Sequence, residues 1–248
     1  MIEERYYIWD NKLFKFVVEQ DEWCDSPRKM YDNVGVMCIW WDSRYELGDD
    51  NETRGVDPHE YLEKLIDKHM PDANYEHGEL GTIELLEILK TCEDIVYLDL
   101  HVFEHGMLSV STHEFITPWG GSWDQGLAGL IWMDKEHYSY LCGDNDDWKD
   151  HAKKILENEV KEYDMYLQGE VYLMGEAEYD IDEEDFGENE WTGGYFSDKY
   201  GDDLVEELFS YEWGKDMPKL YEDFDEAIEE YRKALVRSGN VFDSLRLA

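Results

Sequence analysis

The feature that most constrains this chain is its surplus of acidic side chains. Its 248 residues include 62 Asp and Glu against 22 Lys and Arg, a formal net charge of −40 at pH 7. A chain with this much like charge repels itself and folds only if it buries enough apolar surface. Hydrophobic residues at 42% and aromatic residues at 15% meet that requirement. We therefore expect a folded protein and not a disordered acidic tail.

The same charge argues against nucleic acid and anionic membranes as direct partners. Proteins that bind DNA or RNA draw affinity from Lys and Arg at the phosphates, and we find no basic cluster in the sequence. No run approaches the roughly 18 to 20 apolar residues of a membrane helix. The opening MIEERYYIWD lacks the basic and apolar regions of a secretory signal. We expect a soluble, cytoplasmic protein.

The cysteines give no sign of a metal site or a disulfide framework. They are far apart in the sequence and form no CxxC pair. We expect buried free thiols at Cys24, Cys38, Cys92 and Cys142.

A surface dense in carboxylates can occupy the basic groove of another protein and so mimic DNA. A folded chain of this mass exposes about 11,500 Å², or roughly one net charge per 290 Å². DNA carries roughly one charge per 110 Å², so mimicry requires carboxylates that cluster. The segment from Glu176 to Glu190 has nine acidic residues and no basic one. The alternative is that the charge only keeps the protein soluble or reflects adaptation to salt.

Hydrophobic periodicity predicts a mixture of strands and helices. We expect strands at Tyr6–Trp9, Leu13–Val18, Val34–Trp41, on both sides of Glu104-His105-Gly106, at Leu127–Met133 and at Val171–Leu173. We expect helices at 58–70, 82–89, 146–167, 203–211 and 223–236. Without regular βαβ alternation, the class is α+β, a mixed antiparallel sheet with flanking and C-terminal helices. We expect one domain over residues 1–248, with residues 201–248 as a helical appendage.

Tests for known catalytic motifs predict no catalytic residue, no metal site and no cofactor. His101, Glu104 and His105 spell HxxEH, but on a strand the two histidine Cα atoms would lie roughly 13 Å apart, too far for one zinc ion. The acidic stretches fail the calcium-loop register, and no nucleophile elbow or phosphate-binding loop is present.

One loop carries the alternative hypothesis of an enzyme. The sequence PWGGSWDQG places aromatic side chains beside a carboxylate, an arrangement that suits sugar stacking, although such a turn also serves as plain structure. A hydrolase or transferase pocket would then be lined by His113, Trp119, Trp123 and Asp124.

Three stretches together resemble a family of proteins encoded by bacteriophages and mobile elements. They are SPRKMYDNVGVMCIWWDSRYELGDDN (26–51), STHEFITPWGGSWDQGLAGLIWMDKE (111–136) and ENEVKEYDMYLQGEVYLM (157–174). The chain departs from the family's Cys-Trp-Gly-Phe-type segment, because WTGGYFSDKYG (191–201) lacks the cysteine. In the first stretch, we interpret Asp32, Arg44 and Asp49 as residues that hold loops around a buried strand. The resemblance implies a phage or plasmid origin, a setting in which inhibitors of restriction or CRISPR systems are frequent.

Charge and resemblance together lead to one hypothesis. We expect an acidic, phage-encoded inhibitor in the cytoplasm of the bacterial host. It would occupy the basic groove of a nucleic-acid-binding protein, such as a restriction or CRISPR effector, a nuclease or a helicase. The partner-binding residues would be Glu176, Asp180, Asp182, Glu183, Glu184, Asp185, Glu188 and Glu190. A phage accessory protein that binds its partner without inhibiting it is a further alternative. A homodimer would extend the acidic face, and the sequence leaves it open.

Overall fold

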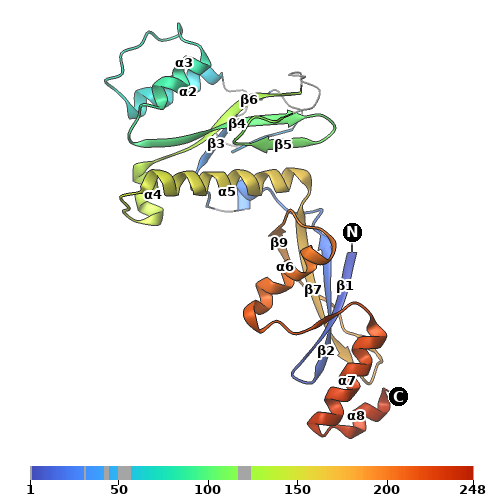
Figure 1. The fold of residues 1–248 in the computed structure, drawn as a ribbon. Helices are drawn as coiled ribbons and strands as arrows, with labels where there is room; N and C mark the ends of the chain where they lie inside the picture. The colour runs from blue at the N-terminus through green and yellow to red at the C-terminus, as the bar shows by residue number, and fades with distance from the viewer. Residues whose placement is uncertain (1, 31, 42–44, 50–56, 117–123, 248) are drawn as a thin grey trace. The chain divides into compact units, whose positions relative to one another are not determined.

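The computed structural model describes residues 2–30, 32–41, 45–49, 57–116 and 124–247 (Figure 1). The fold class is α+β, with antiparallel sheets and C-terminal helices, as the sequence predicts. Its contacts divide the chain into two compact units. The terminal unit joins Met1–Cys24 to Gly169–Ala248, and the central unit is Asp25–Gln168. The expectation of a single domain stays a prediction, because compactness describes contacts and not independent folding.

The central unit is a four-stranded antiparallel sheet between helices. Its strands lie in the order β3 (Val36–Ile39), β6 (Gln125–Asp134), β4 (Ile95–Glu104) and β5 (Leu108–Ser111). The helices are α1 (Pro27–Met30), α2 (Pro58–His69), α3 (Thr82–Leu89), α4 (Lys135–Cys142) and α5 (Trp148–Gln168). Figure 1 shows α2 and α3 on one face of this sheet and α5 on the other.

Alternation along the strands gives this sheet two apolar cores. Met37 and Ile131 pack toward α5, whereas Cys38 and Leu130, one residue away on each strand, pack toward α2 and α3. All four side chains are fully buried. Successive strand residues point to opposite faces, so both faces of this short sheet must be covered. That is why the apolar runs here are continuous, as in a sheet that is buried on both sides.

The terminal unit is built around a second antiparallel sheet. Its strands β10 (Leu220–Tyr221), β1 (Ile2–Trp9), β2 (Lys12–Gln20) and β7 (Val171–Asp180) are neighbours in that order, and β8 (Asp185–Phe186) and β9 (Glu190–Phe196) both pair with β7. The helical elements are α6 (Gly201–Trp213), the 3₁₀ turn η1 (Gly214–Asp216), α7 (Phe224–Ser238) and α8 (Val241–Arg246). Phe16 and Leu208 of α6 belong to one core, and Leu13 and Tyr231 of α7 to another. Helices α6 and α7 therefore complete the cores of this unit.

Local signals predict these elements well. Asp10 and Asn11 both have positive φ, 47° and 58°, which suits the two-residue turn expected between β1 and β2. Asp57 accepts hydrogen bonds from the backbone N–H groups of His59 and Glu60, so it caps α2 one residue before Pro58. The strand expected at Val34–Trp41 is shorter, Val36–Ile39. No helix in the described ranges is long and apolar enough to cross a membrane.

The four cysteines are free thiols. Cys38 and Cys92 are buried, as expected, whereas Cys24 is half-buried and Cys142 is exposed. Cys142 ends α4 at the surface, so its exposure follows from its place at a helix terminus.

The close approach of β6 to β3 depends on Gly129. A Cβ atom at this position would lie 2.1 Å from the carbonyl oxygen of Cys38 and 2.9 Å from Cα of Ile39. We predict that Gly129→Ala lowers the free energy of unfolding by about 2 kcal/mol or more, because backbone atoms must move apart. Gly187→Ala is the matched control, since its Cβ would meet only the Glu178 carbonyl oxygen at 3.7 Å. Urea unfolding checks both, and equal stability of the two variants would contradict the prediction.

Candidate functional site

The acidic segment Glu176–Glu190 forms a hairpin at one end of the terminal sheet. Its first part continues β7, which runs to Asp180, well beyond the expected end at Leu173. The reason is that buried and exposed side chains alternate along the strand. Ala177 and Tyr179 are buried, at 4% and 8% exposure, and the acidic residues on either side of them point to the opposite face. The alternation Glu-Ala-Glu-Tyr-Asp is the signal that the sequence analysis missed.

The tip of the hairpin is held by its own carboxylates. The Asp180 carboxylate accepts hydrogen bonds from the backbone N–H groups of Asp182, at 2.7 Å, and Glu183, at 3.3 Å. This arrangement is typical of an Asx turn. Glu184 takes a positive φ of 55°, and Asp180 then pairs with Asp185 across the two strands. The turn therefore presents several acidic side chains from consecutive positions.

The structure brings together most of the predicted partner-binding residues and exposes them. Exposed side chains are Asp180, Asp182, Glu183, Glu184, Asp185, Glu188 and Glu190. Cations of the same unit neutralise little of this charge: Asp182 pairs with Arg246, and the neighbouring Glu178 pairs with Lys12 at 2.8 Å. Within the described part of the chain, no salt bridge engages Glu183, Glu184, Asp185 or Glu188. Asp185 accepts a hydrogen bond from the backbone N–H of Phe186 at 2.8 Å, so the four carboxylates are exposed and not neutralised by a side-chain cation in this part of the structure.

Glu176 differs from the other predicted residues because it is half-buried. Its carboxylate accepts a hydrogen bond from the hydroxyl group of Tyr7, a side chain that is 1% exposed. Burial raises the pKa of the Glu176 carboxyl above its ordinary value; the Tyr7 hydrogen bond opposes this shift, and the nearby Glu212 and Glu190 carboxylates add to it. The geometry supports a structural role for Glu176, and its part in partner binding stays a prediction.

The acidic surplus as a whole is not confined to the hairpin. The terminal unit carries 30 acidic and 10 basic residues, and the central unit carries 32 and 12. Each unit thus has the same net charge of −20. What distinguishes the hairpin is local density, with four consecutive acidic residues from Asp182 to Asp185.

The alternative enzyme pocket is only partly within the described residues. Trp119 and Trp123 lie outside them. Asp124 pairs with His105, whose Nδ1 atom lies 2.9 Å from the Asp124 Oδ2 atom, and both side chains are exposed. His113 instead contacts the hydroxyl group of Thr112 at 3.0 Å. The geometry therefore does not join His113 to Asp124.

The HxxEH residues lie on β4 and its turn. His101 is in the strand, Glu104 ends it, and Gly106, with φ of 77°, follows His105 in the turn to β5. The Glu104 carboxylate accepts a hydrogen bond from the Trp41 indole at 3.2 Å. Among the residues that the structure describes, no group of three or more His, Cys, Asp or Glu side chains is placed to hold a metal ion.

A buried arginine in the central unit is the polar feature that the sequence analysis missed. Arg28 donates to Asp49 at 2.8 Å, to Glu159 at 2.7 Å and to the Gly35 carbonyl at 2.6 Å. The carboxylates in turn accept backbone N–H groups, Glu159 that of Gly35 and Asp49 that of Met37. Asp49 thus holds a loop beside β3, as we interpreted it, whereas Arg44 lies outside the described residues.

A cavity opens beside this arginine. Its volume is about 880 Å³, and it is lined partly by Lys29, Asp32, His137 and Tyr140. Arg28 also lines it, but its guanidinium is already engaged by protein acceptors on all three nitrogen atoms. The geometry therefore supports a structural role for Arg28 rather than a ligand contact.

The chemistry of the hairpin is that of an anionic recognition surface. Exposed carboxylates on a short, hydrogen-bonded turn can accept Lys and Arg side chains of a partner. No protein-family model, curated protein or solved structure matches the chain.

We predict that Glu176→Gln stabilises the protein at pH 7 and that this gain shrinks as the pH falls toward 4.5. Because the folded-state pKa of the Glu176 carboxyl is raised, the protonated side chain stabilises the fold below the unfolded pKa of 4.5, and this stabilisation is lost as the pH rises through the folded-state pKa. At pH 7 the charged carboxylate in its half-buried site therefore lowers the free energy of unfolding, and Gln removes this cost. Glutamine keeps an acceptor for Tyr7 without the charge. Urea unfolding at several pH values measures the difference. Glu178→Gln, which removes an exposed partner of Lys12, is the control, and the same gain in both variants would refute the assignment.

Proposed function

We propose that the protein is an inhibitor that binds the basic groove of a nucleic-acid-binding protein, with the acidic hairpin in place of the phosphates. The observation that carries the proposal is the group of exposed carboxylates at Glu183, Glu184, Asp185 and Glu188, which lack salt bridges within the described residues. Carboxylates that already have cations close by would gain little from a partner. Free ones gain charge-assisted hydrogen bonds.

The construction of the hairpin supports this role. Tyr179 and Phe186, on β7 and β8, pack with ring centroids 5.2 Å apart, and both belong to the core beside α7. The apolar side of the hairpin is therefore anchored while its acidic side stays in water. A site that is ordered before binding loses less conformational entropy when the partner arrives.

The charge of the whole chain supports rapid and selective encounter. A net charge of −40 attracts a basic groove over a distance set by the ionic strength. It disfavours direct contact with DNA or RNA, whose phosphates are repelled. The partner in this proposal is thus a protein with Lys and Arg in its nucleic-acid groove.

The resemblance to phage and mobile-element proteins supports the narrower form of the proposal. In that form, the partner belongs to a host defence system that targets nucleic acid, such as a restriction or CRISPR effector, and inhibition takes place in the host cytoplasm. The hairpin argument does not depend on this narrower form, because it concerns only the chemistry of the groove.

The test compares two variants with the same change in charge. The hairpin variant carries Glu183→Gln, Glu184→Gln, Asp185→Asn and Glu188→Gln. The control carries Asp72→Asn, Glu76→Gln, Glu79→Gln and Glu93→Gln, all exposed residues of the central unit. Wild-type protein captures the partner from bacterial lysate at low salt, and mass spectrometry identifies it. We predict that the hairpin variant binds the purified partner at least about tenfold more weakly, with a flatter salt dependence, because four charge-assisted contacts are lost.

Competition and activity assays complete the test. Duplex DNA should displace the wild-type protein, and the wild type and the control variant should inhibit the partner equally. Binding without inhibition would favour an accessory protein. Equal affinity of the hairpin and control variants would refute the role of the hairpin.

A further inference from the structure

We propose that His77 is a pH-dependent clasp, which fastens the loop between α2 and α3 to the surface of α2 when its imidazole ring is protonated. The loop spans residues 70–81 and belongs to the central unit. It contacts α2 through Tyr75, His77 and Gly78. The inference concerns this loop alone and does not depend on the function proposed for the acidic hairpin.

The ring of His77 lies between two carboxylates of α2. Its Nδ1 atom is 3.4 Å from the Glu63 Oε2 atom, and its Nε2 atom is 3.5 Å from the Asp67 Oδ1 atom. Glu63 and Asp67 are four residues apart, so they lie on the same face of the helix. Both nitrogen atoms of the ring therefore face an acceptor.

This arrangement suits a protonated ring and not a neutral one. Neutral imidazole carries one N–H group, so one of the two carboxylates must face a nitrogen lone pair. The imidazolium ion carries two N–H groups and can donate to both carboxylates. Histidine usually changes its protonation between pH 5 and 8, whereas carboxylates generally stay ionised in this range. The clasp therefore tightens as the pH falls from about 7.5 to 5.5.

His77 is also the residue that relieves repulsion between the two carboxylates. Among the residues that the structure describes, the salt bridges of Glu63 and Asp67 are those with His77. Two like charges four residues apart on a helix repel each other. A neutral ring leaves this repulsion in place, and a protonated ring offsets it.

The other polar and charged groups around the loop are engaged in contacts of their own. The Tyr75 hydroxyl donates to Asp67 at 2.8 Å, and burial together with this hydrogen bond raises its pKa, so it stays a donor over this pH range. From α3, the Glu84 carboxylate accepts the backbone N–H of Gly81 at 2.8 Å. The lysines of α2 make contacts elsewhere, Lys64 with Glu60 and Lys68 with the ring of Trp132.

The Gly78 amide reports whether the loop is held on α2. Its N–H donates to the Glu63 Oε1 atom at 2.6 Å, and Glu63 is the same carboxylate that faces Nδ1 of His77. Opening of the loop breaks this hydrogen bond and exposes the amide to exchange with solvent.

The clasp controls how firmly an acidic part of the surface is held. Three acidic residues of the loop, Asp72, Glu76 and Glu79, are exposed. Protonation of His77 adds a positive charge beside them, which further favours the closed loop over the open one.

The test measures the hydrogen-exchange protection factor of the Gly78 amide in the full chain by NMR at pH 7.5 and 5.5. A protection factor already corrects for the pH dependence of exchange in an unstructured chain. We expect wild-type protection to be about threefold higher or more at pH 5.5, because one exposed ion pair shifts an equilibrium by a factor of roughly 1.5 to 5 and two form here. The amide of Leu62, a fully buried residue of α2, serves as the reference for unfolding of the whole unit.

Three variants identify the group that responds to pH. His77→Gln should lose the dependence, since glutamine does not titrate. Asp67→Asn should reduce it, because one of the two ion pairs is lost while an acceptor for Tyr75 remains. His59→Gln is the matched control: His59 also lies on α2, with its Nδ1 atom 3.4 Å from the Asp57 Oδ1 atom, and its loss should leave the dependence at Gly78 unchanged. Circular dichroism spectra establish that each variant is folded.

Several results would overturn the proposal. Equal protection of Gly78 at the two pH values in the wild type would do so, and so would a dependence of wild-type size in folded His77→Gln. A parallel rise at Leu62 would show that the whole unit, and not the loop, responds to pH. Loss of the dependence in His59→Gln would transfer the effect from His77 to the start of α2.

Discussion

The constraint on which this structure depends is the excess of 62 acidic over 22 basic side chains. Each carboxylate needs water or a proton donor, and cations are too few to serve them all. The protein therefore uses its cations selectively. Among the residues that the structure describes, Arg28 is the one charged side chain that is buried. Its two carboxylate partners, Asp49 and Glu159, are less buried. The two carboxylates also accept backbone N–H groups, Glu159 that of Gly35 before β3 and Asp49 that of Met37 within β3. Removing one member of this group would leave an uncompensated charge. One buried cation thus organises several segments that are distant in sequence.

The same constraint shapes the acidic hairpin in a different way. Among the described residues, salt bridges engage only Glu178 and Asp182 of its carboxylates, so the hairpin must be held together by its apolar side. Tyr179 and Phe186 supply that side, and the Asp180 carboxylate satisfies the backbone of the turn. The carboxylates on the other side repel one another in water, where dissolved salt screens the repulsion and limits its energetic cost. The apolar side chains and the exposed carboxylates thus lie on opposite faces of one short hairpin.

Periodicity and turn residues predicted much of the fold, because these signals are local. The β1–β2 hairpin, the capped helix α2 and the long helix α5 each have their own signature in sequence. The pairing of β2 with β7 has none: Val17 lies opposite Gly175, far along the chain, so the composition of the terminal unit could not be read from local patterns. The extent of β7 was missed because acidic residues obscured its alternation. The Arg28 cluster was missed for a related reason, since partners at positions 49 and 159 meet only in the folded chain.

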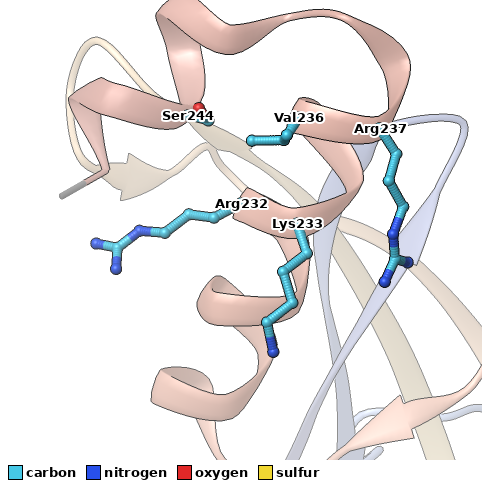
Figure 2. A pocket seen from close by; sticks show the side chains of 5 residues that line it. All are labelled: Arg232, Lys233, Val236, Arg237 and Ser244. Carbon is cyan, nitrogen blue, oxygen red and sulfur yellow. The ribbon is translucent and has the colours of Figure 1, made fainter.

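The basic residues of the C-terminal helices pose a related question, namely where so acidic a protein places positive charge (Figure 2). Helix α7 gives a physical answer. Its first half carries Asp225, Glu226, Glu229 and Glu230, and its second half carries Arg232, Lys233 and Arg237. This order follows the helix dipole, which favours acids at the first turn and bases at the last. Lys233 pairs with the Glu230 carboxylate three residues before it, and the charge of Arg237 acts on the same carboxylate. The dipole thus favours the order of charges along α7, with acids in its first half and bases in its second.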